Sequence, residues 1–286
     1  MKLVVRISNT DLAAASPSHD FVHAIAELVR EKHSVTVVHG RNRVLLGAIP
    51  PADSTPSAPA AHSLIASHIR DLDLMAGAKL NKTLVAMLGK ARTQAVGLFG
   101  SDGNIIRTRQ KLGHNGNRLR LNDEASGNDA GEIGVEVAAV EPFWLEVIAR
   151  NGGVPVIANF ALGPDDEYYC IDADQLAAAC AIAWNADALI FLTREDGIRN
   201  SDGSIIRWVN SEQLTGLAQD TAIPRSLLSK LGACHYALRR GVRRARILPI
   251  ARSESLASFY FTKIEWGTEV ILPAEDHVAA NLLQPS

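Results

Sequence analysis

Residues 155–198 read PVIANFALGPDDEYYCIDADQLAAACAIAWNADALIFLTREDGI, and this stretch decides the fold. The apolar run 155–159 predicts a strand, an alanine-rich helix follows it, and the apolar run 188–193 predicts a second buried strand. The loop between the first strand and the helix is dense in carboxylates, which are Asp165, Asp166, Glu167, Asp172 and Asp174. Because ligand sites in open α/β sheets form at the carboxyl ends of strands, the stretch predicts an α/β fold with a site in this loop.

The same alternation of apolar strands and amphipathic helices runs along the whole chain. Strands are predicted over Leu3–Ile7, Val35–Val38, Ala95–Phe99, Pro155–Asn159, Ala188–Leu192, Arg246–Pro249 and Glu269–Leu272. Helices are predicted over Ser18–Lys32, Leu64–Lys90, Pro142–Asn151, Asp174–Asn185, Ser211–Ala218 and Leu227–Arg240. This order predicts a three-layer αβα sandwich with a mainly parallel central sheet and helices on both faces.

Four polar segments interrupt the alternation. SDGNIIR at 101–107 and SDGSIIR at 201–207 repeat one another, and Asp-Gly between apolar flanks predicts a tight hairpin turn without chemistry at each place. Residues 50–63 are rich in Pro, Ser and Ala and predict an irregular loop. Residues 112–131 predict a second polar insertion, either a loop or a β-ribbon.

Composition limits the classes of function. The chain has 286 residues, of which 47% are hydrophobic, so it can bury one large core or two smaller ones. The formal net charge of −2 gives no support to binding of nucleic acid or of an anionic membrane. No apolar run is long enough to span a membrane, and no secretory signal precedes the first strand. Three scattered cysteines without a CxxC pair favour a reduced, cytoplasmic protein over a disulfide scaffold or a zinc site.

Three segments together resemble the acetylglutamate kinase branch of the amino-acid kinase superfamily. They are LNKTLVAMLGKARTQAVGLFGSDGNIIRTRQK at 80–111, DADQLAAACAIAWNADALIFLT at 172–193 and SKLGACHYALRRGVRRARIL at 229–248. The order and spacing of these segments also match the family, and the likeness extends from about Lys2 to Leu272.

The resemblance implies a division of labour between two domains. Residues 1–184 would hold the acyl acceptor and pair in a homodimer, and residues 185–286 would hold ATP. The reaction would transfer the γ-phosphoryl group of ATP, with Mg²⁺, to the γ-carboxylate of N-acetyl-L-glutamate in arginine biosynthesis. A carboxylate acceptor needs no general base at neutral pH, so catalysis would depend on positioning the substrates and neutralising their charge.

The resemblance assigns the chemistry to three residues. Lys230 matches the lysine that stabilises the migrating phosphoryl group, although the local pattern also fits a solvated helix lysine. Asp174 matches the carboxylate that orients the catalytic lysines, and it also fits an aspartate that caps a helix N-terminus. Arg6 stands where the first strand of the family has its lysine, which keeps the positive charge in a larger, planar group.

The glycine loops of the family are altered in this chain. The first strand of the family ends in Lys-Leu-Gly-Gly, whereas Ser8 and Asn9 replace the two glycines that let backbone approach phosphate. The second strand of the family ends in His-Gly-Gly-Gly, of which only Gly40 remains as a glycine, followed by Arg41 and Asn42. Arg41 either contacts an anion or fills the cleft, and the sequence favours neither.

The polar residues of the family's ligand sites are altered as well. The family's acceptor-binding arginine segment is absent, and ungapped counting places His62 at its position. Asp172 replaces an amide beside the anionic acceptor. On the ATP side, Thr193 and Gly197 remain candidate nucleotide contacts, and Arg194 replaces an aspartate.

These departures leave two further hypotheses open beside an acetylglutamate kinase-like enzyme. The chain could be a non-catalytic paralogue that pairs with a competent kinase as a subunit or regulator. It could also be a kinase for a different acyl acceptor, because His62 and Asp172 would alter the acid pocket. An active kinase should have a vacant cleft next to Lys230, whereas Arg41, Arg194 or Arg225 should lie across that cleft in a pseudokinase.

Overall fold

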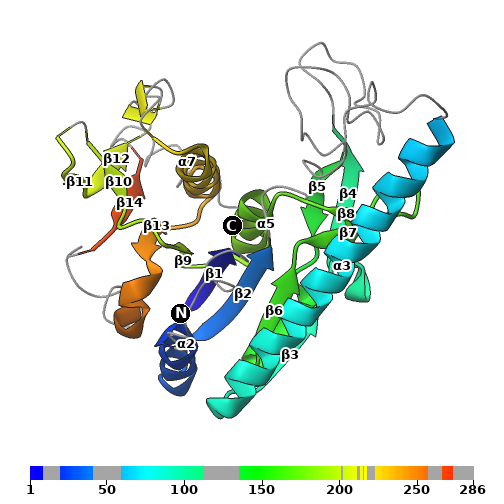
Figure 1. Ribbon diagram of the computed structural model, residues 1–286. Helices are drawn as coiled ribbons and strands as arrows, with labels where there is room; N and C mark the ends of the chain where they lie inside the picture. Colours follow the sequence, from blue (N-terminus) through cyan, green and yellow to red (C-terminus); the bar gives the residue numbers. More distant parts are fainter. Residues whose placement is uncertain are drawn as a thin grey trace.

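One twisted sheet forms the centre of the molecule (Figure 1). The computed structural model describes residues 1–8, 20–40, 59–111, 135–200, 202–210, 213–214, 216–217, 223–256 and 266–272, apart from the side chains of 59–70 and 253–255. Among these residues, eight strands pair in the order β12-β14-β13-β9-β1-β2-β6-β3. They are β1 (Lys2–Ser8), β2 (Ser34–Gly40), β3 (Ala95–Leu98), β6 (Val154–Ala158), β9 (Ala188–Thr193), β12 (Trp208–Asn210), β13 (Arg244–Pro249) and β14 (Thr268–Ile271). Their pairs are parallel except β13–β14, which is antiparallel.

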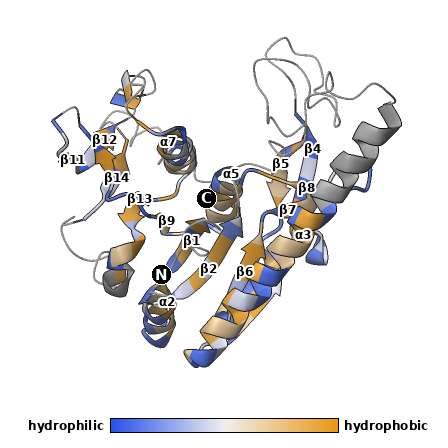
Figure 2. Ribbon diagram, in the orientation of Figure 1, coloured by the Kyte–Doolittle hydropathy of each residue, from blue (hydrophilic) through white to orange (hydrophobic). Residues whose placement is uncertain are grey.

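Helices cover both faces of this sheet. One face packs a hydrophobic cluster against α2 (Asp20–Arg30) and α3 (Pro59–Lys90). The other face packs a larger cluster against α4 (Phe143–Arg150), α5 (Ala173–Ala183) and α7 (Arg225–Leu238). Figure 2 shows the strands between these layers to be largely hydrophobic. The predicted three-layer αβα sandwich with a mainly parallel sheet is therefore confirmed.

Three short antiparallel pairs lie beside the main sheet. They are β4 (Ile106–Gln110) with β5 (Val135–Val140), β7 (Phe160–Leu162) with β8 (Tyr168–Cys170), and β10 (Ile198–Arg199) with β11 (Ile205–Ile206). Two short 3₁₀ helices, Asp102–Asn104 and Ile250–Ser255, complete the described elements. The β7–β8 pair carries the chain from the end of β6 to the start of α5, and so connects the edge of the sheet to the helix that covers it.

The register of the central strands brings their carboxyl ends to one edge. Ser8 at the end of β1 pairs with Gly40 at the end of β2, and His39 pairs with Ala158 at the end of β6. On the other side of β1, Ile7 pairs with Leu192 near the end of β9. Side chains that follow these four strands therefore meet at a single edge, where a site in a parallel sheet is expected.

All seven predicted strands form, but two other sequence predictions are wrong. The helix α3 begins at Pro59, so residues 59–63, including His62, are helical and the prediction of a loop there is wrong. The 201–207 repeat forms the predicted hairpin, with β10 and β11 as its arms. The 101–107 repeat does not, because a 3₁₀ turn joins β3 to β4 and β4 pairs instead with the distant β5. Residues 112–131 lie outside the described residues, and so do 211–212, 215 and 218. The other residues of the helix predicted over 211–218, which are 213–214 and 216–217, are helical.

Among the described residues, none of the helices has the length and apolar character needed to cross a membrane. The mainly apolar α5, for example, spans only Ala173–Ala183 and packs against the sheet.

Glu146 on α4 contacts Lys2 on β1 and Trp184 at the end of α5. Because these contacts favour the ionised carboxylate, the stability of the chain should depend on acid pH. Its carboxylate contacts Lys2 Nζ at 2.8 Å and Arg150 Nη2 at 2.9 Å, and it accepts a hydrogen bond of 2.8 Å from Trp184 Nε1. The hydrogen bonds that Glu146 accepts, first from Lys2 and then from Trp184, lower its pKa to about 2. Because the folded pKa lies below the ordinary value, the stabilisation is complete above about pH 4.5 and is lost as the pH falls towards about 2.

We therefore expect the free energy of unfolding to fall between these two pH values, and Glu146→Gln to reduce that fall. At pH 7 the variant should lose only about 1 kcal/mol, because the carboxylate is partly exposed and Gln still accepts from Trp184. Urea denaturation at pH 7, 4.5 and 3 measures both quantities. An acid-induced loss of the same size in the variant would contradict the assignment.

Candidate functional site

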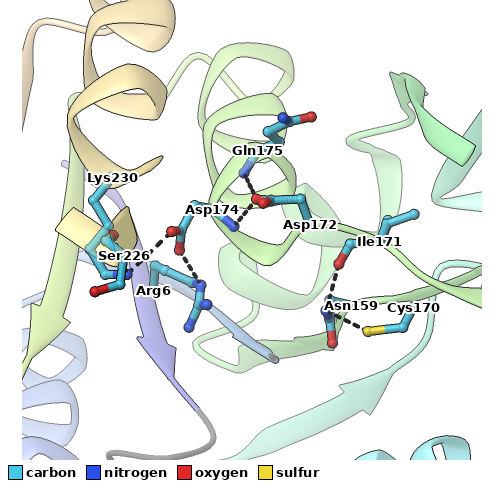
Figure 3. A network of polar contacts seen from close by, with 9 residues as sticks. All are labelled: Arg6, Asn159, Cys170, Ile171, Asp172, Asp174, Gln175, Ser226 and Lys230. Atoms are coloured by element: carbon cyan, nitrogen blue, oxygen red, sulfur yellow. Dashed lines mark hydrogen bonds and ion pairs between the residues drawn. The ribbon is translucent and has the colours of Figure 1, made fainter. Parts of the chain in front are cut away.

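A buried ion triad lies at the carboxyl edge of the sheet (Figure 3). Arg6 on β1 places Nε 3.0 Å from Oδ1 of Asp174, and Lys230 on α7 places Nζ 3.2 Å from Oδ2 of the same carboxylate. The three residues are almost inaccessible, with exposures of 1% for Arg6, 0% for Asp174 and 4% for Lys230. The sequence predicted these three as a group, and the structure brings them into direct contact from three separate elements.

The local structure explains why each side chain of the triad reaches the centre. Arg6 shares the face of β1 that carries Val4, and this face packs under α5 and α7. Asp174 lies in the first turn of α5, and Lys230 lies in the second turn of α7, where its Nζ also donates to Ser226 O at 3.3 Å. Two cations share one carboxylate, so the triad carries a net positive charge in a region of low dielectric constant. Such a group is suited to an anion.

Asp172 begins α5. Its Oδ1 accepts hydrogen bonds from the backbone N–H groups of Asp174 at 2.9 Å and of Gln175 at 2.8 Å, which is the geometry of an N-cap. The capping role considered for Asp174 therefore belongs to Asp172. Burial, and then the charge of Asp174, raises the pKa of Asp172 above its ordinary value, although the capping bonds oppose this shift. The carboxylate that departs from the family is thus engaged by the helix N-terminus.

Asn159, directly after β6, makes a set of polar contacts at this edge and was missed by sequence reasoning. Its Nδ2 donates to Ile171 O at 2.6 Å and contacts Cys170 Sγ at 3.2 Å, which ties β6 to the approach to α5 (Figure 3). A side chain on Gly40 would overlap the side chain of Asn159, so the close approach of these two strand ends requires glycine. A buried polar residue directly after five buried apolar residues was the signal that could have identified it.

His39 and Asn81 form a second buried polar contact at this edge, which the sequence also did not indicate. Asn81 Nδ2 lies 3.0 Å from His39 Nε2, and the two residues are 1% and 0% exposed. Burial, with a smaller effect from the charge of Arg6, lowers the pKa of His39 to about 3. The imidazole is therefore neutral at physiological pH.

The residues expected on the nucleotide side lie around the end of β9. Thr193 ends the strand and its Oγ1 accepts from the backbone of Glu195 at 3.4 Å. Arg194 is exposed. Gly197 has a φ of +135°, and a Cβ there would crowd Ile205 and Thr268 at 2.9 Å, so packing alone accounts for this glycine.

The remaining candidates divide between the edge and the parts of the chain outside the description. Ser8 and Gly40 pair at the ends of β1 and β2, close to the triad in the sheet. Asn9, Arg41 and Asn42 lie outside the described residues, and of His62 only its place in α3 is described. Arg225 begins α7 and is exposed.

Comparison with known proteins agrees with the fold and with the sequence motifs. The model of the amino acid kinase family matches residues 1–249. Acetylglutamate kinase of Acidobacterium capsulatum is 38% identical over 272 residues, which covers 95% of this chain and 99% of that protein. Acetylglutamate kinase of Koribacter versatilis is 32% identical over 272 residues, with the same two coverages.

A solved structure extends the agreement to three dimensions. N-acetylglutamate synthase of Neisseria gonorrhoeae, in complex with coenzyme A and N-acetyl-glutamate, superposes with a TM-score of 0.67 at 19% identity, over 96% of this chain and 60% of that chain. At this identity the likeness concerns the fold alone. The family match over most of the chain and the identity to full-length relatives go further: the chain belongs to the amino acid kinase family, in its acetylglutamate kinase branch.

Proposed function

We propose that this chain transfers the γ-phosphoryl group of ATP to the γ-carboxylate of N-acetyl-L-glutamate, as in arginine biosynthesis. The observation that carries the proposal is the buried triad, in which Arg6 and Lys230 converge on one carboxylate of Asp174. Relatives named acetylglutamate kinase, identical at 38% and 32% along nearly their whole length, support the choice of acceptor.

The residues of the triad have separate tasks in this proposal. Lys230 and Arg6 neutralise the charge of the transferring phosphoryl group, whose oxygens repel the acceptor carboxylate. Asp174 holds both cations in place, so little reorganisation is needed when charge develops. The acceptor is already ionised at neutral pH, and the proposal assigns no residue as a general base.

The cations and hydrogen-bond donors at this edge suit the phosphate groups of a nucleotide. ATP supplies the phosphoryl group, and Arg6, Lys230 and Ser8 would hold its phosphate oxygens, while Thr193, Arg194 and Gly197 would lie along the nucleotide. The site carboxylates do not fit a metal-ligand role, because both oxygens of Asp174 contact cations and Asp172 caps α5. We therefore assign Mg²⁺ to no residue and expect it to enter with the nucleotide.

The wider organisation is proposed on the same basis. Residues 1–184 would form the acceptor and dimerisation domain, and residues 185–286 the ATP domain. Exposed apolar side chains on α3 and on the edge strand β3 support a homodimer through the first domain: Leu72 is 61% exposed, Met75 68% and Val96 43%. The three cysteines are buried and none forms a disulfide, in keeping with a cytoplasmic protein.

Calorimetry with Mg-ATP, followed by trapping of the acyl phosphate with hydroxylamine, tests the proposal. We expect nucleotide binding and a hydroxamate that depends on N-acetyl-L-glutamate. A chain that binds no nucleotide at millimolar concentration would contradict the enzyme. Turnover with other acyl amino acids but not with N-acetyl-L-glutamate would show a kinase for a different acceptor.

A second candidate function, a non-catalytic paralogue that pairs with a competent kinase, is favoured by the burial of the triad. Arg6 and Lys230 are only 1% and 4% exposed, so a phosphoryl group reaches them only if the surrounding chain opens. Arg194 and Arg225, which could have filled a disabled cleft, are instead exposed, and Arg41 lies outside the described residues. Calorimetry and the hydroxamate assay together separate the two candidates, because only the enzyme yields an acyl phosphate.

At neutral pH, Asp172→Asn should keep or raise the stability of the chain and lower the KM for the acceptor. The pKa of Asp172 is raised, so its stabilising contribution is complete below about pH 3.8 and declines as the pH rises through the folded value. Asparagine caps as well as aspartate and carries no charge, so we expect the free energy of unfolding at pH 7 to be unchanged or up to about 1 kcal/mol higher.

The matched control is Asp172→Ala, which removes the cap and should cost about 1 kcal/mol. Chemical denaturation at pH 7 and at pH 3.5 measures both variants. The KM for N-acetyl-L-glutamate should also fall in Asp172→Asn, because one negative charge beside an anionic acceptor is removed. Equal destabilisation by both substitutions would contradict this assignment.

A further inference from the structure

A buried amide–imidazole contact joins α3 to the end of β2. Asn81 Nδ2 lies 3.0 Å from His39 Nε2 and donates to Val156 O on β6 at 2.9 Å. Both side chains are inaccessible, and they come from residues 42 positions apart in the chain. One side chain of α3 thus contacts the two neighbouring strands β2 and β6, close to their carboxyl ends.

The two N–H groups of the Asn81 amide determine which nitrogen of the His39 imidazole carries the proton. The side-chain amide of Asn81 has two N–H donors, one directed to Val156 O and the other to His39 Nε2. His39 Nε2 must then accept, so the proton of the neutral ring is on Nδ1. An imidazolium could not accept this bond, which agrees with the burial-driven fall in the pKa of His39 to about 3.

Gly97 on β3 makes room for this contact. A Cβ at position 97 would overlap Oδ1 of Asn81 and would also lie 3.1 Å from Nζ of Lys82. Gly97 pairs with Val156, the residue whose carbonyl accepts from Asn81. The glycine therefore lets α3 approach the sheet closely enough for the Asn81 amide to reach β2.

The contact between Asn81 and His39 restrains the backbone of Gly40, the residue after His39. The carbonyl of His39 accepts from the backbone N–H of Asn159 at 3.2 Å, and Gly40 abuts the Asn159 side chain. The end of β2 is thus held on one side by Asn81, through the imidazole, and on the other by Asn159. Asn159 also bonds Ile171 O, which leads into α5 and the triad.

We propose that Asn81 and His39 are positioning residues, which fix the backbone of Gly40 for the acyl acceptor. The inference rests on the proposed function, because it names a task on the acceptor side of that reaction. The contact between the two side chains holds the end of β2, whereas the ion pairs of the triad join β1, α5 and α7. Loss of the Asn81 amide should therefore weaken acceptor binding and leave nucleotide binding in place.

Asn81→Ala tests this directly, with Lys82→Ala as the matched control. Lys82 is the next residue on α3, is exposed, and makes only a long contact of 3.4 Å with Gly97 O among its described bonds. In Asn81→Ala we expect kcat/KM for N-acetyl-L-glutamate to fall about tenfold to 100-fold, mainly through KM, because a loop misplaced by about 1 Å has an effect of this size. The KM for ATP should stay within about twofold, since Lys230 and Arg6 are untouched. An unchanged acceptor KM, or equal rises in both KM values, would overturn the proposal.

Gly97→Ala approaches the same contact from the sheet. Its methyl group should displace the Asn81 amide and reproduce the rise in acceptor KM, and it should add little in the Asn81→Ala background, where the space is vacant. Effects that simply add would show that the two residues act separately. This non-additivity is a result that general destabilisation would not produce.

Nitrogen NMR of ¹⁵N-histidine-labelled protein gives a readout that does not need activity. At pH 7 the His39 resonances should show a protonated Nδ1 and a bare Nε2, and the assignment comes from a His39→Gln variant. A proton on Nε2 would overturn the hydrogen bond. Calorimetry with N-acetyl-L-glutamate then separates the failures: no binding by the unmodified chain removes the proposed function and the inference, whereas equal binding by Asn81→Ala removes only the inference.

Discussion

Asp174→Ala should destabilise the chain by about 3–5 kcal/mol, the range for a buried ion pair that loses one partner. The substitution leaves two cations, Arg6 and Lys230, inaccessible to water and without their carboxylate. A guanidinium does not deprotonate in proteins. Arg6 therefore remains charged, and we expect the penalty to come mainly from it. Since domains are stable by only about 5–15 kcal/mol, this loss is large.

Urea denaturation measures the effect, and a compensated variant identifies its cause. The combination of Arg6→Met, Asp174→Leu and Lys230→Met replaces the ions with apolar side chains, and it should recover most of the loss. If the cause were instead the small cavity left by the carboxylate, the single Asp174→Leu substitution would be as stable as the combination. A loss under about 1 kcal/mol in Asp174→Ala would contradict the buried triad, because it would mean that water reaches Arg6.

The strands were predictable because burial on both faces leaves a continuous apolar run. All six residues of β9 are buried, and so are all five of β6, which is the pattern of a parallel sheet covered by two helical layers. The grouping of Arg6, Asp174 and Lys230 was predicted only through the family resemblance. No local pattern places β1, α5 and α7 at one point, since the residues are far apart in the chain.

Prediction from local sequence was wrong where tertiary contacts determine the local structure. The two SDG repeats share six of seven residues, yet only the second forms a hairpin. At the first, Gly103 packs against the indole of Trp144, and the following strand pairs with β5. The same limit explains Asp172 and Asp174: either could cap a helix, and the choice depends on α5 beginning at Ala173.

The polar contacts at the strand ends were missed for a related reason. His39, Asn81 and Asn159 each lie in or beside an element with ordinary periodicity, and their partners are 11 to 75 residues away. Gly97 was visible as a glycine inside a predicted strand, which indicates close approach of another group. What it accommodates, the Asn81 amide, became clear only from the packing of α3 on β3.

Lys230→Met should lower kcat/KM by about 10³-fold, or roughly 4 kcal/mol in transition-state stabilisation, the upper range for loss of one preorganised donor. Methionine keeps the volume of the lysine stem, and Asp174 keeps its contact with Arg6 at 3.0 Å, so the fold should survive. The loss should appear in kcat more than in KM, because the ammonium contributes most when charge develops on the transferring group. Lys230→Arg should restore only part of the rate, since a planar guanidinium cannot occupy the position of Nζ beside Ser226 O.

Lys90→Met is the matched control, because it makes the same substitution at an exposed lysine in the last turn of α3. The hydroxamate assay measures kcat and KM for each variant, and calorimetry with Mg-ATP measures nucleotide binding separately. Full turnover in Lys230→Met would exclude Lys230 from the chemistry while leaving the kinase intact. An unmodified chain that binds Mg-ATP but yields no hydroxamate with any acyl amino acid would favour the non-catalytic paralogue. In that case the triad still stabilises the fold, so Asp174→Ala should still lower the free energy of unfolding although the chain has no activity. The two experiments together therefore separate the structural task of the triad from its catalytic one.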